Sequence, residues 1–223
     1  MELGAAAGVL ARAFRDNPLN RAVIGGGERR RVRANRAGVA AYLPAAFARA
    51  RVTAVRQGGA LAGVLVATKP GGWPLPPPGA AGLLGLLVGQ GFRVARRWGE
   101  VSRELARHHP QGPLWYLATL GVEPGLWGRG VGQVLLGDFV AQVDADGCGA
   151  YLETDRRELT GFYGRAGFRV EQEIEVFGVP VLLMERRARA GKVAIASEAR
   201  SEPQASEVHG PEARSEPQAN GVI

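Results

Sequence analysis

The chain has 223 residues, a formal net charge of +7 and a single cysteine, Cys148. This length is sufficient for one domain with a substantial core. One cysteine excludes an internal disulfide and fits a reducing, cytoplasmic environment. Arg12 and Arg15 interrupt the apolar start, so no signal peptide is expected, and no apolar run reaches the roughly 18 residues of a membrane span. We therefore expect a cytoplasmic protein with no membrane partner.

Arginine supplies almost all of the positive charge, because Lys69 and Lys192 are the only lysines. Ten arginines lie between Arg12 and Arg51. Aromatic side chains do not alternate with them in the regular way that a nucleic-acid stacking platform would require. We interpret them as a solvated helix face and expect no nucleic-acid partner; nucleic-acid contact and steering of an anionic ligand are the alternatives.

The first half of the chain predicts helical stretches separated by one hairpin. The helical stretches are Ala5–Phe14, ended by Asn17-Pro18, then Glu28–Ala50, and a third from about Ala80 to His108. Two apolar runs flank Gln57-Gly58-Gly59, which is typical of a hairpin turn. The prolines between Pro70 and Gly79 predict a stiff, extended loop.

The most informative segment follows the third helical stretch. An apolar run, Leu114–Val122, predicts a strand and ends at Glu123-Pro124. A loop with glycines at 128, 130 and 132 then opens into Val131–Val143, where apolar residues recur at helical spacing. A strand, glycine loop and helix in this order aim unpaired backbone N–H groups and a positive helix end at an anion, usually a phosphate.

Two motifs carry a family resemblance. Trp127-Gly-Arg-Gly-Val-Gly132 resembles the acyl-CoA pyrophosphate signature of the GNAT acyltransferase superfamily, Gln/Arg-x-x-Gly-x-Gly/Ala, except that tryptophan occupies its first position. Gly161-Phe-Tyr-Gly-Arg-Ala-Gly-Phe168 resembles the family's Phe-Tyr-x-x-x-Gly-Phe at the usual spacing from the glycine loop. Between and after them we expect a strand at Cys148–Thr154, a helix at Asp155–Ala166 and strands near 170 and 182.

The resemblance implies an α/β (α+β) fold with a mixed sheet, in a single domain over residues 1–189 whose core motifs span 114–168. It also implies that acetyl-CoA is the co-substrate and enters between two splayed strands, those ending at Val122 and Glu153. The backbone of Leu120, Gly121 and Val122 would pair with pantetheine. The N–H groups from the loop and helix start would hold the pyrophosphate; these residues are Gly128, Arg129, Gly130, Val131, Gly132 and Gln133.

The resemblance further implies direct transfer of an acetyl group to an amine within a ternary complex. Tyr163 matches the family tyrosine that commonly protonates the departing thiolate, and packing behind the cofactor is the alternative role. The glutamate that some members use as a base is replaced by Tyr116, which could relay a proton through water. Glu153 is another candidate base, or else a cap or ion pair for the neighbouring helix. His108 and His109 end a predicted helix, where imidazolium would suit the negative pole.

Two functions therefore remain open. The first is an N-acetyltransferase acting on a small-molecule amine or a protein amino group. The second is a non-catalytic acyl-CoA-binding or regulatory module, favoured by the departures at Trp127, Tyr116 and Leu159, since Leu159 stands near a position where the family often has asparagine. Three histidines and one cysteine at no ligand spacing predict no metal site. A homodimer is conceivable.

The end of the chain differs in composition. Glu198–Ala205 recurs letter for letter at Glu212–Ala219. Such a repeat, poor in large apolar residues, cannot bury enough surface to offset its ordering entropy. We expect residues 190–223 to form a dispensable, disordered, low-complexity tail.

Overall fold

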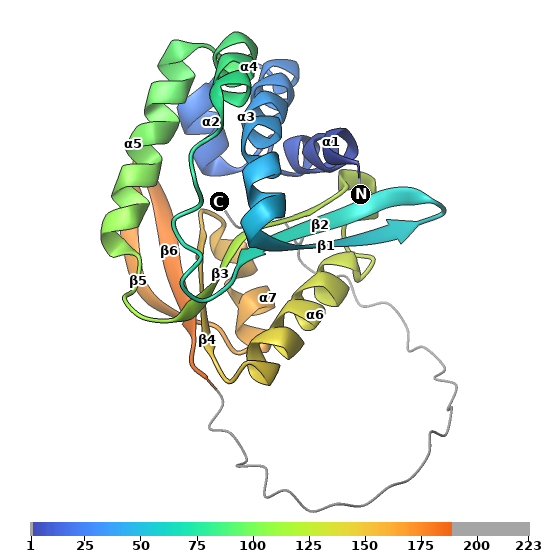
Figure 1. The fold of residues 1–223 in the computed structure, drawn as a ribbon, viewed down its shortest axis with the longest axis vertical. Helices are drawn as coiled ribbons and strands as arrows, with labels where there is room; N and C mark the ends of the chain where they lie inside the picture. The colour runs from blue at the N-terminus through green and yellow to red at the C-terminus, as the bar shows by residue number, and fades with distance from the viewer. Residues whose placement is uncertain (1, 189–223) are drawn as a thin grey trace, which may run out of the picture.

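One mixed sheet organises the protein, whose computed structural model describes residues 2–188. The expected tail at 190–223 lies outside these residues. The sheet has six strands in the order β1-β2-β3-β4-β6-β5 (Figure 1). The strands are β1 (Ala50–Gln57), β2 (Ala60–Thr68), β3 (Leu114–Val122), β4 (Gly149–Thr154), β5 (Arg169–Val176) and β6 (Val179–Arg186). Only β3 and β4 are parallel neighbours; the other neighbouring pairs are antiparallel. The predicted α/β fold with a mixed sheet is confirmed.

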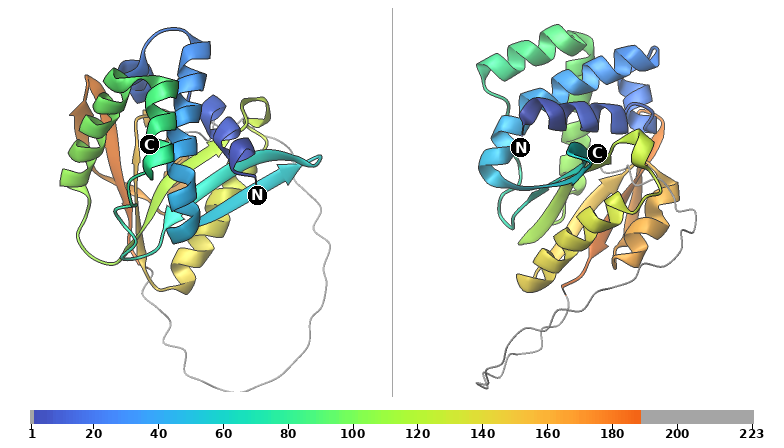
Figure 2. Two further views of the ribbon diagram at one scale, coloured as in Figure 1. Left: turned by 45° about the horizontal axis from the view of Figure 1, so that its top comes forward. Right: turned by 90° about the vertical axis from the view of Figure 1, so that its right-hand side faces the viewer.

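Helices cover both faces of this sheet (Figures 1 and 2). One face carries α1 (Leu3–Ala13), α2 (Pro18–Ile24), α3 (Glu28–Arg49), α4 (Ala80–Gln90) and α5 (Phe92–His108). The other face carries α6 (Val131–Ala145) and α7 (Thr160–Arg165). The sheet is therefore the middle of three layers, with α1–α5 on one face and α6 and α7 on the other.

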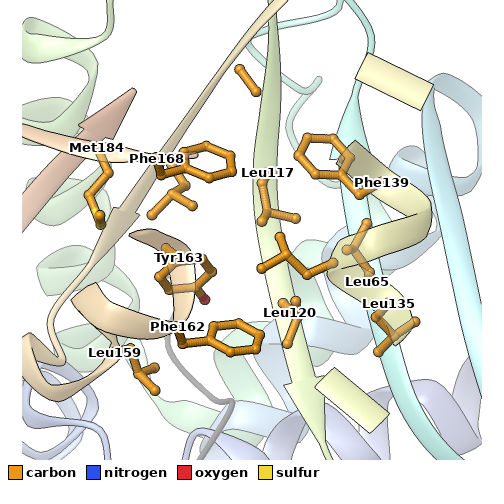
Figure 3. Packing of buried hydrophobic residues seen from close by; sticks show 14 of the residues in the cluster. Leu65, Leu117, Leu120, Leu135, Phe139, Leu159, Phe162, Tyr163, Phe168 and Met184 are labelled. Carbon is orange, nitrogen blue, oxygen red and sulfur yellow. The ribbon is translucent and has the colours of Figure 1, made fainter. Parts of the chain in front are cut away.

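The alternation of side chains along the strands divides the core between these layers. Leu65, Leu117 and Leu152 pack with α6 and α7 in one cluster (Figure 3). Alternate residues of the sheet point to the opposite face, where Tyr151 and Val181 pack against α5 and Val64 and Val66 pack against α1 and α3. Because successive strand residues face opposite sides, each central strand contributes to both clusters.

Most predicted elements are present, with local corrections. The hairpin at Gln57-Gly58-Gly59 is confirmed, and both glycines have positive φ, of 57° and 80°. The single helix expected from Ala80 to His108 is wrong: Gly91, at φ 84°, separates α4 from α5. The helix expected over Asp155–Ala166 is shorter, because a 3-10 turn at Arg157–Leu159 precedes α7. The sequence reading also missed α2, which begins at Pro18.

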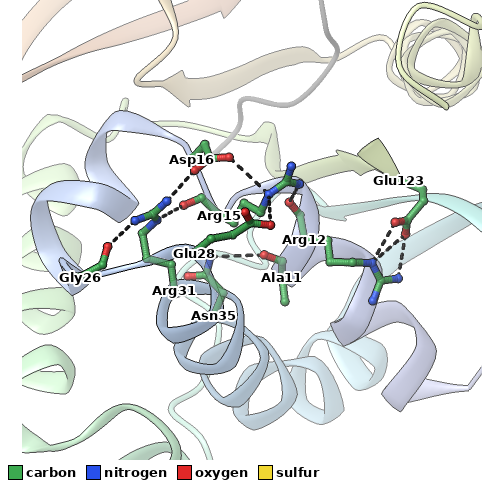
Figure 4. A network of polar contacts seen from close by, with 9 residues as sticks. All are labelled: Ala11, Arg12, Arg15, Asp16, Gly26, Glu28, Arg31, Asn35 and Glu123. Carbon is green, nitrogen blue, oxygen red and sulfur yellow. Dashed lines mark hydrogen bonds and ion pairs between the residues drawn. The ribbon is translucent and has the colours of Figure 1, made fainter. Parts of the chain in front are cut away.

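Ion pairs join the N-terminal helices to each other and to the loop after β3 (Figure 4). The Arg31 side chain, only 11% exposed, donates to Asp16 at 2.7 Å and to the carbonyl oxygens of Arg15 and Gly26. Arg12 donates to both carboxylate oxygens of Glu123. Arg31 therefore holds the N-terminal helices together. The expectation that it lies on a solvated helix face is wrong.

Asp155 fastens the start of α2 to the end of β4. It is 6% exposed, accepts the backbone N–H of Leu19 at 2.7 Å, and accepts the Asn17 amide at 3.2 Å. Burial raises the pKa of Asp155 to about 6, although these hydrogen bonds act to lower it. No pattern in the sequence predicts this role of Asp155, which holds the start of α2 against the end of β4.

We predict that Asp155→Ala destabilises the protein by about 1–3 kcal/mol, because it leaves a buried N–H and a buried amide without an acceptor. Urea unfolding would measure this. Asp138→Ala is the matched control, since that carboxylate pairs with Arg51 at a half-exposed surface position and its loss should cost less than about 0.5 kcal/mol. Equal losses for the two variants would contradict the fastening role of Asp155.

Candidate active site

The central feature of the site is a gap between β3 and β4. The two strands pair only from Leu114↔Gly149 to Tyr116↔Tyr151. Beyond this point β3 continues to Val122 and β4 to Thr154, each still paired on its other side, with β2 and with β6. The predicted splay between the strands ending at Val122 and Glu153 is confirmed. No strand of the described structure pairs with the inner edge of β3 over residues 117–121 or of β4 over residues 152–154, so an inserted chain could pair there.

A bulge in β3 accompanies the splay. The register with β2 shifts so that Val66 opposes Thr119 while Ala67 opposes Leu117. Ala118 is the extra residue, and it restores Leu120 to the same face as Leu117. A bulge bends a strand and increases its twist. Its position at the start of the gap accounts for the divergence of β3 from β4.

The glycine loop lies at the open end of this gap. Gly128 and Gly130 have φ of 74° and 77°, and Gly130 is the N-cap of α6. The N–H groups of Val131 and Gly132 lie in the first turn of α6, where the helix itself supplies no acceptor. The Arg129 N–H, by contrast, donates to the Leu126 carbonyl at 3.3 Å. The loop presents a positive helix end framed by left-handed glycines, which suits an anion.

Trp127 has a structural role that the sequence did not reveal. Its indole Nε1 donates to the Val122 carbonyl oxygen at 2.9 Å, and its ring packs against the core. The Arg15 guanidinium lies 5.9 Å from the ring centroid. Tryptophan at a position where a polar residue is expected is the one sequence feature that points to this role. The Trp127 side chain anchors the loop to the end of β3 by packing and by this hydrogen bond.

Leu120, Gly121 and Val122 lie in the splayed half of β3, as expected. They pair with Leu65, Val64 and Gly63 of β2 on the opposite edge. A Cβ at Gly121 would come within 2.7 Å of a Leu10 methyl group, so glycine here permits α1 to pack directly on β3. The gap-facing edge of this segment is available for backbone pairing, except that the Val122 carbonyl accepts from Trp127.

Tyr163 lies on the face of the sheet covered by α6 and α7. It is fully buried, and it packs with Leu120, Phe162 and Leu159 (Figure 3). Its hydroxyl has no hydrogen-bond partner in the described structure, and burial raises the pKa of this phenol well above its usual value. A buried hydroxyl without a partner is costly, so its position is explained if a ligand supplies the partner. Leu159 is a buried core residue.

Glu153 and Tyr116 lie on the opposite face. Glu153 is 2% exposed, and the nearby hydroxyls of Tyr116 and Tyr151 act to lower its pKa. Burial raises the pKa of Glu153 to about 7 and raises the pKa of Tyr116 well above its usual value. Oε2 of Glu153 has no partner within the described chain. The suggested role of Glu153 as a helix cap or ion pair is not what the structure shows; Asp155 caps α2.

Aromatic rings surround this carboxylate. Trp73 stacks on His109 with centroids 3.8 Å apart, and His109 contacts Tyr116 and Tyr151 edge-on at 5.2 and 5.0 Å. Burial lowers the pKa of His109 to about 4, so the expectation of an imidazolium is wrong. The Tyr151 hydroxyl lies within electrostatic reach of Glu153 without a well-formed hydrogen bond.

A cavity opens beside these rings. It has a volume of about 220 Å³, and its lining includes Trp73, Trp98, Tyr116 and Glu153. The residues of α5 complete the wall. Tyr116 and Glu153 thus face a cavity on one side of the sheet, whereas Tyr163 lies on the other, with the gap between β3 and β4 separating them.

Residues 2–188 contain no group of three or more His, Cys, Asp or Glu side chains arranged to hold a metal ion. Within the same part of the chain, no helix combines the length and apolar character needed to cross a bilayer.

The splay, the glycine loop and the buried tyrosine coincide with a family match. The family model described as Acetyltransferase (GNAT) family matches residues 31–168, more than half of the chain. The chain belongs to the GNAT acetyltransferase family. Membership indicates an acetyltransferase, and the resemblance predicted from the two motifs is confirmed.

Solved structures agree on the fold of this GNAT protein. It is similar to a structure titled histone acetyltransferase HPA2 and related acetyltransferase from Corynebacterium glutamicum, with TM-score 0.63, 23% identity, and coverage of 84% of this chain and 92% of that one. It is also similar to PH1933 from Pyrococcus horikoshii, with TM-score 0.51, 15% identity, and coverage of 84% and 90%. At these identities the likeness concerns the fold.

We predict that Glu153→Gln stabilises the protein at pH 7.5 by up to about 3 kcal/mol and changes little near pH 4.5. The pKa of Glu153 is higher in the folded protein than in the unfolded chain, so the folded state binds more protons between about pH 4.5 and 7. The free energy of unfolding of the wild-type protein therefore falls as the pH rises through this range. Glutamine keeps the shape of the side chain and stays neutral across this pH range. Urea unfolding of both proteins across this range would test this; a difference independent of pH would contradict it.

Proposed function

We propose that the protein is an N-acetyltransferase that moves an acetyl group from acetyl-CoA directly to an amine in a ternary complex. The observation that carries this proposal is the placement of two buried groups on either side of the splay. Glu153 can accept a proton on the cavity face, and Tyr163 can donate one on the α6–α7 face. A transfer reaction requires both, because the amine loses a proton and the departing thiolate gains one.

The described residues fit a CoA thioester. The edges of β3 over residues 117–121 and of β4 over residues 152–154, which no strand covers, suit a pantetheine amide chain, and the start of α6 suits a pyrophosphate. The buried, unpartnered hydroxyl of Tyr163 is explained by a partner that enters the gap. When bound, acetyl-CoA supplies an activated acyl group at the end of a long flexible arm, so the chain's own residues need only position it and move protons.

Glu153 is the residue best suited to receive the amine's proton. With its pKa raised to about 7, it is substantially ionised at neutral pH and is basic enough to accept a proton there. Tyr116, whose hydroxyl lies near Glu153 and which lines the same cavity, would orient the carboxylate or relay the proton. Tyr163 remains protonated at any physiological pH, so its hydroxyl proton is available to the sulfur. A non-catalytic CoA-binding module, the alternative, would need neither group.

We predict that millimolar acetyl-CoA raises the melting temperature, since a ligand at a hundred times its Kd adds about 2.7 kcal/mol. Gly130→Val should abolish this shift, because a β-branched residue is strained at a φ of 77°. Gly125→Val is the matched control: it lies in the same loop, and an added Cβ meets only open space. Differential scanning fluorimetry would measure both, and no shift for wild-type protein would refute CoA binding.

We predict that Tyr163→Phe lowers kcat by roughly ten- to a thousandfold without lowering stability. Phenylalanine keeps the ring and removes an unpartnered buried hydroxyl, so the fold should be as stable or more so.

Glu153→Gln should abolish the rise in kcat/KM through about pH 7 that Glu153 ionisation produces in the wild type. Tyr42→Phe, at the surface, is the control.

Steady-state assays with varied pH and acceptor would measure these effects. Full activity of Tyr163→Phe at every pH would remove Tyr163 from the mechanism. Binding of acetyl-CoA with no transfer to any amine by wild-type protein would favour the non-catalytic module.

A further inference from the structure

The cavity above Glu153 has an unusual charge environment for so arginine-rich a chain. None of the residues that line it within the described structure carries a positive charge. His109, which backs Trp73 and Tyr116, is neutral because burial lowers its pKa to about 4. Among the described residues that line the cavity, Glu153 alone is charged near neutral pH, and its Oε2 lacks a partner.

The remaining lining is apolar and aromatic. Trp98, Val101 and Leu105 come from successive turns of α5, and Trp73 comes from the proline-rich loop. Such walls favour a planar or aliphatic body, and aromatic faces also favour a nearby cation. The volume of about 220 Å³ is below the roughly 300–1,000 Å³ of pockets for drug-sized ligands. The occupant is therefore small.

We infer that the acceptor is a small primary monoamine whose only charged group is the amine and whose body is apolar or aromatic. This inference rests on the proposed function and narrows its acceptor. The ammonium would pair with Glu153, which accepts its proton before transfer, while the body lies between Trp73 and Trp98.

The same features exclude three common classes of amine. An amino acid would bury its carboxylate beside Glu153 with no cation to pair with, and an unpaired buried charge is strongly unfavourable. A diamine would place its second ammonium against the apolar wall of α5, again without a partner. A peptide amino terminus would bring backbone amide groups into the same apolar surroundings.

Two matched pairs of acceptors test these exclusions. 2-Phenylethylamine and phenylalanine differ by one carboxylate, and pentylamine and 1,5-diaminopentane differ by one ammonium. We expect kcat/KM to favour the monoamine in each pair by about 100-fold or more. A ratio near one in either pair, or faster acetylation of a short peptide than of 2-phenylethylamine, would overturn the inference.

Variants of the wall connect this preference to the cavity. Trp98→Ala should raise KM for 2-phenylethylamine by about tenfold or more. Ser102 lines the exposed mouth, and Ser102→Arg should improve phenylalanine relative to 2-phenylethylamine by at least about tenfold, because it supplies the missing cation. Ser102→Gln, long but neutral, is the control and should leave the ratio unchanged. An equal effect of both Ser102 variants would argue against charge selection.

Binding measured without acetyl-CoA separates this inference from the proposed function. Titration of 2-phenylethylamine should quench tryptophan fluorescence, and phenylalanine at the same concentration should not. Selective quenching without any acetylated product would support the monoamine site and refute the transferase. Acetylation of other amines, with 2-phenylethylamine neither bound nor modified, would refute the monoamine site and leave the transferase standing.

Discussion

The parallel pairing of β3 with β4 extends over three residue pairs, and the arrangement of the site follows from where it stops. A strand edge released from its neighbour has unsatisfied N–H and C=O groups, which in an interior must find another partner. Here the outer edges of both strands remain paired, so the sheet tolerates the opening. The bulge at Ala118 and the glycine loop after Val122 lie at its two ends: the bulge bends β3 away from β4, and the loop turns the chain into α6.

Burial of ionisable groups around the gap is the second constraint. Glu153, Asp155, Tyr116 and Tyr163 all have pKa values raised chiefly by removal from water. Only Asp155 has a full set of partners that explain it structurally, since it fastens α2. Glu153 and Tyr163 retain unpartnered atoms, which is the pattern expected where binding or chemistry, and not folding, accounts for a buried polar group.

Local sequence signals predicted the parts of the fold that local physics determines. Gly58 and Gly59 specify a turn, and the glycine loop followed by helical periodicity predicts the start of α6. What the sequence could not supply were long-range contacts. Nothing local indicates that Trp127 donates to Val122, that Asp155 caps a helix more than a hundred residues earlier, or that Trp73 and Trp98 line one cavity. The Phe-Tyr motif singles out Tyr163 as a candidate, whereas nothing in the sequence around Glu153 indicates that its carboxylate is buried.

Gly91 separates α5 from α4, so the helix that lines the cavity beside Glu153 is an element of its own. The wall of the cavity comes from α5 and the loop around Trp73, both of which precede β3 in the chain, whereas the groups around the thioester path come from β3 onward. In the proposed enzyme, acceptor recognition and acyl transfer would thus occupy consecutive, almost non-overlapping stretches of polypeptide that meet at Tyr116 and Glu153. Exchange of the segment 73–106 between relatives is accordingly expected to change the acceptor preference and to leave the residues proposed for acyl transfer unchanged.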